Sequence, residues 1–386
     1  MNKNQERSQR PYCGSVENFL EIGKSQEKVE EFKNPWEYDF KYEYSNGNLD
    51  KYWNLDEEKD IIKRLLKYKA NYKAANSNGF DCDGSGEKYT CKLSRDIYRR
   101  LWGWNDQQKR YGTIGSCSIS AYGPDTMNSF LTLFCSALNE QNRKIAGKAK
   151  RININFSFLY NLLIEQKKRT KDFLNDKSEQ WKNYAETSHV IGNFVLVPAG
   201  FNPKRSNMFK DFWDLSLLYL KGQVKDNIWL SSSNLFVKYI NYFFLWDYVI
   251  CNEKQPDYYV KSMLLNSDIF MSVNEYRSDL LVSPDRQMPN KTEISNFIEN
   301  AQWAVKRRGI FMTAMLRLQS EKSDEYDRLR SEIFAADKCY NGYKKVIEKI
   351  SKKIALPSTV KDILREEPEW AEIKELQKTQ EKDVNE

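Results

Sequence analysis

The chain contains very little histidine and lacks the closely spaced cysteine pairs that bind structural zinc. Its 386 residues include one histidine, His189, and seven cysteines, none of them in a Cys-x-x-Cys pair. A structural zinc site needs four nitrogen or sulfur ligands, usually held in closely spaced pairs. We therefore expect neither a structural zinc site nor a disulfide framework, and we expect Cys135 and Cys251 to be small core residues.

Motifs for phosphate binding, acyl transfer and calcium binding are absent or incomplete. The glycine-rich stretches at 84–86 and 112–115 are not followed by Gly-Lys-(Ser/Thr), and no Gly-x-Ser-x-Gly turn occurs. The segment 81–86 resembles the start of a calcium loop, but Lys92 stands where an EF-hand needs a bidentate glutamate. We therefore interpret these stretches as surface loops.

Long hydrophobic runs are missing as well. No segment approaches the roughly 18 apolar residues that a membrane helix needs, and the N-terminus lacks the apolar stretch of a signal peptide. A hydrophobic fraction of 40% and an aromatic fraction of 14% can nevertheless supply a core. The sequence predicts a cytoplasmic protein without a membrane partner, most of which folds.

The periodicity of apolar residues predicts an α+β fold that is predominantly α-helical with a few short strands. Strands are expected at 36–44, 152–156 and 193–197. Helices are expected at 55–72, 94–104, 127–139, 160–176, 209–221, 235–249 and 291 to about 318. We divide the chain into a polar arm over 1–33, one α-rich domain over 34–320 and a charged helical extension over 321–386.

Positive charge is in modest excess and gathers in short clusters. The net charge is +7 and the isoelectric point about 8.8. Clustered lysines and arginines bind nucleic-acid phosphates by releasing counterions, although a solvated helix face explains the same pattern. The residues expected to contact phosphates are Arg143, Lys144, Lys148, Lys150, Arg151, Lys204, Arg205, Lys306, Arg307 and Arg308.

The most informative segment is 188–207, which contains His189. Its pattern predicts a strand that starts at Asn193, a turn, and a helix entered at Asn202, an N-cap residue followed by proline. Each residue of this segment also has a packing interpretation. Gly192 fits a close approach of two backbones, and Asn193 fits a residue that bridges a turn.

The order of several blocks resembles a family of uncharacterised bacterial proteins. The blocks are 36–44, 94–102, 191–198, 201–205 and a Phe-Trp-Asp-Leu-Ser-Leu helix over 212–217. The resemblance covers roughly residues 35–310 and implies a single α-rich domain without a known activity. Many members carry a histidine before the Leu-Trp pair of the second block, where this chain has Arg99 and Arg100.

The segment 191–202 is also similar to the second half of the site of HNH-type ββα-metal nucleases. In that family asparagines orient the general base or bind the metal, and a histidine on the preceding strand deprotonates water. No such histidine occurs in this chain, and His189 lies too close in sequence to Asn193 for the usual geometry. The resemblance therefore implies a degenerate HNH-like segment.

These observations leave three hypotheses open. The first is a nucleic-acid-binding, defence-related protein without a cofactor. The second is a metal-dependent nuclease or hydrolase that uses His189, Asn193, Asn202 and Asp214, with Mg²⁺ as its cofactor. The third is a protein-interaction module without chemistry, which requires a protein partner.

Overall fold

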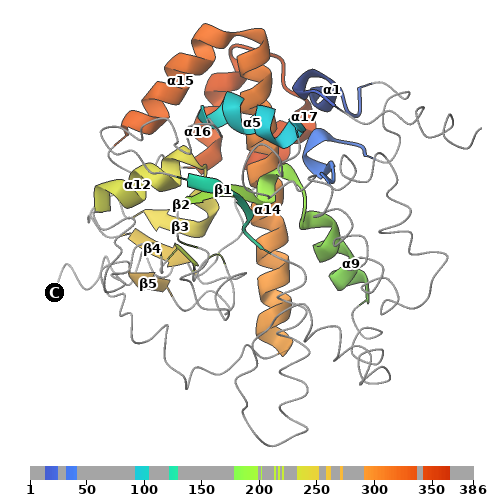
Figure 1. Ribbon diagram of the computed structural model, residues 1–386, viewed down its shortest axis with the longest axis vertical. Coiled ribbons are helices and arrows are strands. Elements are labelled where there is room, and N and C mark those ends of the chain that lie inside the picture. The colour runs from blue at the N-terminus through green and yellow to red at the C-terminus, as the bar shows by residue number, and fades with distance from the viewer. Residues whose placement is uncertain are drawn as a thin grey trace, which may run out of the picture.

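A computed structural model of the protein has the α+β fold, predominantly α-helical with a few short strands, that the sequence predicts (Figure 1). It describes residues 14–24, 32–40, 92–103, 121–128, 178–198, 201, 213, 216, 217, 220, 233–251, 258–261, 270–272, 291–336 and 342–365. In chain order the elements are α1 (Val16–Leu20), η2 (Pro35–Glu37), α5 (Lys92–Trp102), β1 (Ala121–Thr126), α9 (Ser178–Thr187), η3 (Ile191–Asn193), β2 (Phe194–Pro198), α12 (Ser233–Tyr242), η4 (Trp246–Tyr248), β3 (Val249–Cys251), β4 (Tyr258–Lys261), β5 (Phe270–Ser272), α14 (Lys291–Glu321), α15 (Ser323–Ala335), α16 (Gly342–Ser351) and α17 (Ser358–Arg365). Within these ranges no helix has the length and apolar character to cross a membrane.

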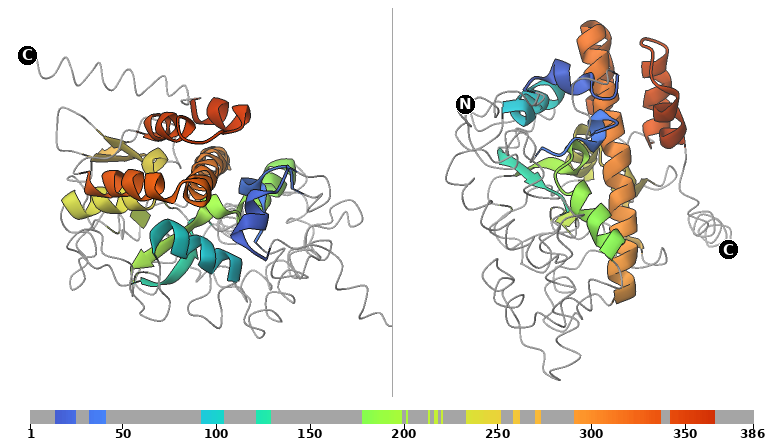
Figure 2. Two further views of the ribbon diagram at one scale, coloured as in Figure 1. Left: turned by 90° about the horizontal axis from the view of Figure 1, so that it is seen from above. Right: turned by 90° about the vertical axis from the view of Figure 1, so that its right-hand side faces the viewer.

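The long helix α14 is the central column of the molecule. It confirms the helix predicted from residue 291 to about 318. The elements α1, η2, α5, α9 and η3 lie on one side of it, and α16 and α17 lie on the other (Figure 2, right). Every residue from Ile310 to Leu318 is buried. A helix that is buried all round in this way belongs to a core, so α14 organises the rest of the fold.

The strand predicted to start at Asn193 is β2, and its partner is a strand that the sequence did not reveal. β1 pairs with β2 in an antiparallel two-stranded sheet, with Asp125 opposite Val195. The sequence predicts no strand over 121–126, because glycine and proline disfavour strand interiors and Gly123 and Pro124 lie in the middle of β1.

The apolar run 235–249 is buried as expected, but it does not form one helix. α12 ends at Tyr242, and the chain then turns at Phe244, which has a left-handed φ of 56°. A non-glycine residue rarely adopts this conformation, so the end of the helix leaves no simple sequence signal. The chain continues through η4 into β3, which joins β4 and β5 in an antiparallel sheet of order β3-β4-β5.

The alternating segment predicted as a strand at 36–44 is not a strand over its described part, residues 36–40. It begins in the 3-10 helix η2 and then runs extended, and the backbone N–H of Phe40 donates to the carbonyl of His189 at 2.9 Å. Trp36, Tyr38 and Phe40 are buried at 4%, 0% and 0% exposure, and Asp39 is also buried at 5%, whereas Glu37 is exposed. The spacing of the aromatic residues therefore reflects their burial, without strand pairing and without alternation of burial over 38–40.

Helix α5 confirms the helix predicted at 94–104 but begins earlier than expected. Ser94, the first residue of the predicted range, is fully buried inside the helix, which starts at Lys92. At the other end Gly103 has a φ of 63° and donates its N–H to the carbonyl of Arg99 at 2.9 Å. This is the left-handed glycine that commonly ends a helix.

Side chains from distant segments bind the last carbonyls of α5. The hydroxyl of Tyr326 donates to the carbonyls of Arg100 and Leu101 at 2.7 and 3.0 Å, and the hydroxyl of Tyr242 donates to that of Trp102. The last carbonyls of a helix have no partner within it, so these bonds satisfy buried acceptors. They also fix α5 against α12 and α15.

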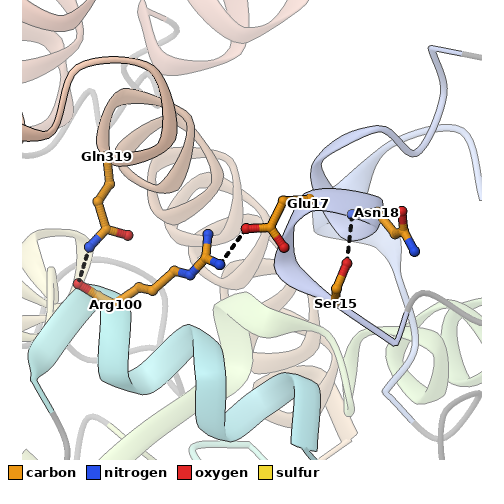
Figure 3. A network of polar contacts seen from close by, with 5 residues as sticks. All are labelled: Ser15, Glu17, Asn18, Arg100 and Gln319. Atoms are coloured by element: carbon orange, nitrogen blue, oxygen red, sulfur yellow. Dashed lines mark hydrogen bonds and ion pairs between the residues drawn. The ribbon is translucent and has the colours of Figure 1, made fainter.

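A polar network joins α1, α5 and the end of α14 (Figure 3). Gln319 donates to the carbonyl of Arg100 at 3.2 Å, and the guanidinium of Arg100 pairs with Glu17. Ser15 caps α1 by accepting from the N–H of Asn18 at 3.2 Å. The Arg100 hydrogen bond is the first cause that lowers the pKa of Glu17. The N-terminal helix is thus held by both α5 and α14.

The core extends across the boundaries that the sequence suggested for the domain. Phe19 of α1, Ile333 of α15, Val346 of α16 and Leu364 of α17 belong to the same hydrophobic cluster as α14. The helical extension after residue 320 therefore packs against the domain as part of its core. Pro357 lies between α16 and α17.

Candidate functional site

The side chain of Asn193 is fully engaged in structural hydrogen bonds. It is 1% exposed, and its amide nitrogen donates to the carbonyls of Asn128 at 2.7 Å and Ser188 at 2.8 Å. Its oxygen accepts from the backbone N–H of Asn128 at 3.0 Å and from the side-chain amide of Asn128 at 3.2 Å. Both ends of the amide therefore tie the residues after β1 to the segment before η3.

Gly192 marks a close crossing of η3 over α14, as its packing interpretation predicted. A Cβ atom at Gly192 would lie 1.9 Å from the carbonyl oxygen of Val305 and 2.7 Å from the nitrogen of Gly309. No real side chain tolerates these distances, so only glycine fits. This crossing positions the whole segment from His189 to β2 on the central helix.

Arg308 is the largest polar group in the core beneath this crossing. It is 0% exposed and donates from Nε to the carbonyl of Phe243 at 2.8 Å. Its Nη1 donates to the carbonyls of Gly192 and Phe194, both at 2.7 Å. The guanidinium carbon lies 5.7 Å from the centre of the Trp102 ring. One side chain thus connects η3, β2 and the end of α12 to α14.

Burial is the main cause that lowers the pKa of Arg308, and neighbouring tyrosines oppose it. An arginine keeps its charge in proteins even when buried, so its donors must be met by acceptors. Three main-chain carbonyls accept from Nε and Nη1, whereas the buried Nη2 has no hydrogen-bond partner among the described residues. The tyrosines that raise its pKa are Tyr343, Tyr248, Tyr98 and Tyr239.

The edge of β2 that faces away from β1 is closed by side chains. Arg308 binds the carbonyl of Phe194, and the hydroxyl of Tyr239 donates to the carbonyl of Leu196 at 2.8 Å. An open strand edge presents unpaired acceptors, which are unfavourable in a core. These two side chains take the place of a third strand at this edge.

Arg307 is also buried and is paired with a carboxylate. It is 5% exposed, and its Nε lies 3.3 Å from Oδ2 of Asp247. Its guanidinium carbon is 4.4 Å from the centre of the Trp303 ring and 5.3 Å from that of Tyr343. This arrangement fixes α14 to η4 and α16.

The burial of Arg307 and Arg308 contradicts their predicted role at a phosphate-binding surface. A residue that is 5% or 0% exposed has no side-chain surface to offer a polyanion. Lys306, the third residue of this basic run, is exposed on α14. The run therefore supplies one surface cation in place of three.

His189, one of the residues of the nuclease hypothesis, lies in the turn between α9 and η3. It is half-buried, its carbonyl accepts from Phe40, and its ring meets the Phe194 ring edge-on with centroids 6.4 Å apart. An HNH-like site needs a histidine on the strand that pairs with β2. That strand is β1, with the sequence Ala-Tyr-Gly-Pro-Asp-Thr, and it supplies none.

Among the residues that the structure describes, no three His, Cys, Asp or Glu side chains gather in a group that could hold a metal. Asn202 and Asp214, the other two residues of the nuclease hypothesis, lie outside the described ranges. So do Arg143, Lys144, Lys148, Lys150, Arg151, Lys204 and Arg205 of the predicted phosphate-binding set. Of the four residues in the nuclease hypothesis, the structure therefore describes His189 and Asn193, and the Asn193 side chain is taken up by structural hydrogen bonds.

A second basic surface, which the sequence analysis did not single out, lies on α16 and the turn after it. Its lysines are all exposed and are named here the lysine face: Lys344, Lys345, Lys349, Lys352 and Lys353. The apolar residues Tyr343, Val346, Ile347 and Ile350 are buried on the opposite side. Helical spacing within 343–353 separates the two sets, so this signal was present in the sequence.

Carboxylates of α15 engage part of the lysine face. Lys349 pairs with Glu332, and Lys353 donates to Glu325 at 3.1 Å. Glu325 also pairs with Arg328 on its own helix. The Lys353 hydrogen bond is the first cause that lowers the pKa of Glu325, so this carboxylate is ionised at neutral pH.

The other three lysines of this face have no such pairing within the described ranges. Lys344, Lys345 and Lys352 are exposed, and Glu348 is the acidic residue interspersed with them on α16. Residues 342–353 contain five lysines and one glutamate. The surface of α16 is therefore strongly positive away from α15.

Comparison of the chain with protein-family models, with curated proteins and with solved structures found no match. The chemistry of the described surfaces is therefore the basis for a functional proposal.

Proposed function

We propose that this protein binds nucleic acid through the lysine face of α16 and does not cleave it. The observation that carries the proposal is the row of exposed lysines on one side of a helix whose other side is buried. A fixed row of cations on a rigid element suits a polyanion with regularly repeated charge. Lys306 on α14 and the basic residues at 143–151, 204 and 205 are further candidates for contacts to phosphates.

The expected contribution of this surface follows from counterion release. Each phosphate neutralised on double-stranded DNA steepens the plot of log binding constant against log salt by about 0.9. Lys344, Lys345 and Lys352 would together supply a slope of about −2.7.

The absence of cleavage is supported by the roles of the HNH-like residues. Asn193 is engaged at both ends of its amide, so it is not available to orient a base or bind a metal. β1 carries no histidine at the place where the nuclease family has its base. A structural role in the core therefore explains the segment 188–198 better than a catalytic role does.

The first test is a binding panel of single- and double-stranded DNA and RNA between about 50 and about 200 mM salt. The triple variant Lys344→Gln, Lys345→Gln, Lys352→Gln should bind double-stranded DNA more weakly, with a slope flatter by about 2.7. The matched control is Lys33→Gln, Lys92→Gln, Lys322→Gln, which removes the same charge from exposed lysines on other segments. It should keep the parent slope.

The outcomes of the panel separate the hypotheses. Equal flattening in both triple variants, or no binding by the parent protein, would overturn the proposal. The panel also includes Mg²⁺ and Mn²⁺ against EDTA. Metal-dependent cleavage that is lost in His189→Ala would establish the nuclease alternative, and a protein complex without nucleic-acid affinity would favour the interaction module.

A further inference from the structure

We propose that Glu325 and Glu332 of α15 compete with nucleic-acid phosphates for Lys353 and Lys349. The lysine face then contacts phosphates with three of its five lysines, and α15 sets the strength of binding. This inference rests on the proposed function, because it concerns the regulation of the same surface.

The competition follows from the placement of the two ion pairs. Lys349 of α16 and Lys353 in the turn after it both pair with carboxylates of α15, so they lie on the same edge of the lysine face. The Glu332 and Glu325 carboxylates lie along that edge. Lys344, Lys345 and Lys352 occupy the rest of the face, away from the α15 carboxylates. The face is thus divided into a paired edge and an unpaired part.

The paired lysines are not locked in place. The side chains of Lys349 and Glu332 are 45% and 48% exposed, and those of Lys353 and Glu325 are 45% and 26% exposed. Exposed ion pairs are weak and are screened by salt. A phosphate can therefore displace a carboxylate, but it must first break the existing pair, and the displaced carboxylate then repels it.

A simpler explanation must be separated from this competition. Any acidic residue on α15 lowers the positive potential of the neighbourhood and weakens binding of a polyanion at long range. Asp324 and Asp327 are exposed on the same helix and make no ion pair with the lysine face. Long-range repulsion predicts the same effect from these two residues as from the two glutamates.

The test compares Glu325→Gln, Glu332→Gln with Asp324→Asn, Asp327→Asn, which changes the net charge by the same +2. Double-stranded DNA is titrated into the full chain across the same salt range. The glutamate variant should steepen the slope by about 1.8, because phosphates no longer compete with these two carboxylates for Lys349 and Lys353. The aspartate variant should keep the parent slope. Equal slopes in the two variants would overturn the competition.

A second pair of variants excludes a contribution from Arg328, which loses its partner when Glu325 is neutralised. Lys349→Gln, Lys353→Gln should change the slope of the parent protein little. Added to the glutamate variant, the same two changes should abolish the gain. If the gain persists without these lysines, another cation causes it and the inference is wrong.

Failure of this inference can be told apart from failure of the proposed function. A parent protein that does not bind nucleic acid at any salt concentration contradicts the proposed function itself. A parent that binds with a slope carried by Lys344, Lys345 and Lys352, and is unaffected by the glutamate change, contradicts the competition alone. Far-ultraviolet circular dichroism of each variant confirms that the compared proteins are folded.

Discussion

At the scale of single residues, Arg308 is important for stability because its buried side chain binds three main-chain carbonyls from different segments. Replacing it with methionine, which has a similar length and no donors, removes the hydrogen bonds to the buried carbonyls of Phe243, Gly192 and Phe194. Each unsatisfied buried acceptor costs about 1 to 3 kcal/mol, partly offset because a buried charge is removed. We expect Arg308→Met to lower the free energy of unfolding by about 3 kcal/mol or more, measured by urea denaturation.

The same variant distinguishes a structural role from a phosphate-binding role. Under conditions where Arg308→Met is folded, its salt slope for DNA binding should equal that of the parent protein. Lys306→Gln is the comparison, since Lys306 precedes it by two residues and is exposed. An Arg308→Met protein of parental stability with a flatter slope would contradict the burial described above.

The two buried arginines also show why the functional surface was predicted only in part. In a helix, successive residues point in directions about 100° apart, so a basic run such as 306–308 cannot share one surface. Which of the three faces solvent depends on what covers α14 on each side, and those elements come from distant parts of the chain. The exposed lysines on and after α16 could have been predicted from the sequence, because the apolar residues of the buried side lie at helical spacing within the same short segment.

At the scale of elements, the crossing of η3 over α14 gives a matched pair of tests. A Cβ at Gly192 would lie 1.9 Å from a main-chain oxygen, whereas a Cβ at Gly309 would lie no closer than 3.2 Å, to Cβ of Trp36. Gly192→Ala should destabilise the fold by about 3 kcal/mol or more, because two backbones must separate. Gly309→Ala should be close to neutral, because the helix propensity of alanine, up to about 1 kcal/mol better than glycine, offsets the tight contact.

The difference between these two variants is measured by thermal or urea unfolding of the full chain. If Gly309→Ala is as damaging as Gly192→Ala, the crossing is tighter on the helix side than described. If both are neutral, η3 does not rest on α14 in solution. Nucleic-acid binding by folded Gly309→Ala should be unchanged, since the lysine face lies on another element.

Elements were predicted well where one local pattern decides them. α14 and β2 followed from apolar spacing over their own residues. The strand expected at 36–44 is not formed over its described part, residues 36–40. Alternating aromatic and charged residues do not by themselves produce strand pairing, and the N–H of Phe40 donates to the carbonyl of His189. β1 was missed because its pairing with β2 outweighs the poor strand propensity of Gly123 and Pro124.

At the scale of the whole molecule, the terminal segments and the central domain share one core. The α15–α17 region was expected to be an extension because its composition is highly charged. Only one face of each helix bears that charge, while Ile333, Val346, Ile350 and Leu364 are buried against the rest. Charge fraction averages over both faces of a helix, so it could not separate an extension from an amphipathic part of the core.

Three buried tyrosines that join these parts predict how the whole fold responds to alkaline pH. Burial is the first cause that raises the pKa of Tyr242, Tyr326 and Tyr343, and each hydroxyl donates to a main-chain carbonyl. A phenolate cannot donate, and it is disfavoured in the core. The unfolded chain, with a tyrosine pKa of about 10, therefore loses its protons at lower pH than the folded chain. The stabilisation is complete below that pH and is lost as the pH rises above it.

We expect the free energy of unfolding to fall above about pH 10, by about 1.4 kcal/mol per pH unit for each tyrosine that stays protonated in the folded state. Tyr326→Phe should be less stable than the parent protein at pH 7, because it loses its bonds to the carbonyls of α5. Between about pH 10 and about pH 11 its unfolding free energy should then fall less steeply than that of the parent protein, by about 1.4 kcal/mol per pH unit. Urea denaturation across this range measures both slopes. Parallel slopes would mean that Tyr326 is ionised as readily in the fold as outside it, and that α15 does not hold the end of α5 through this hydroxyl.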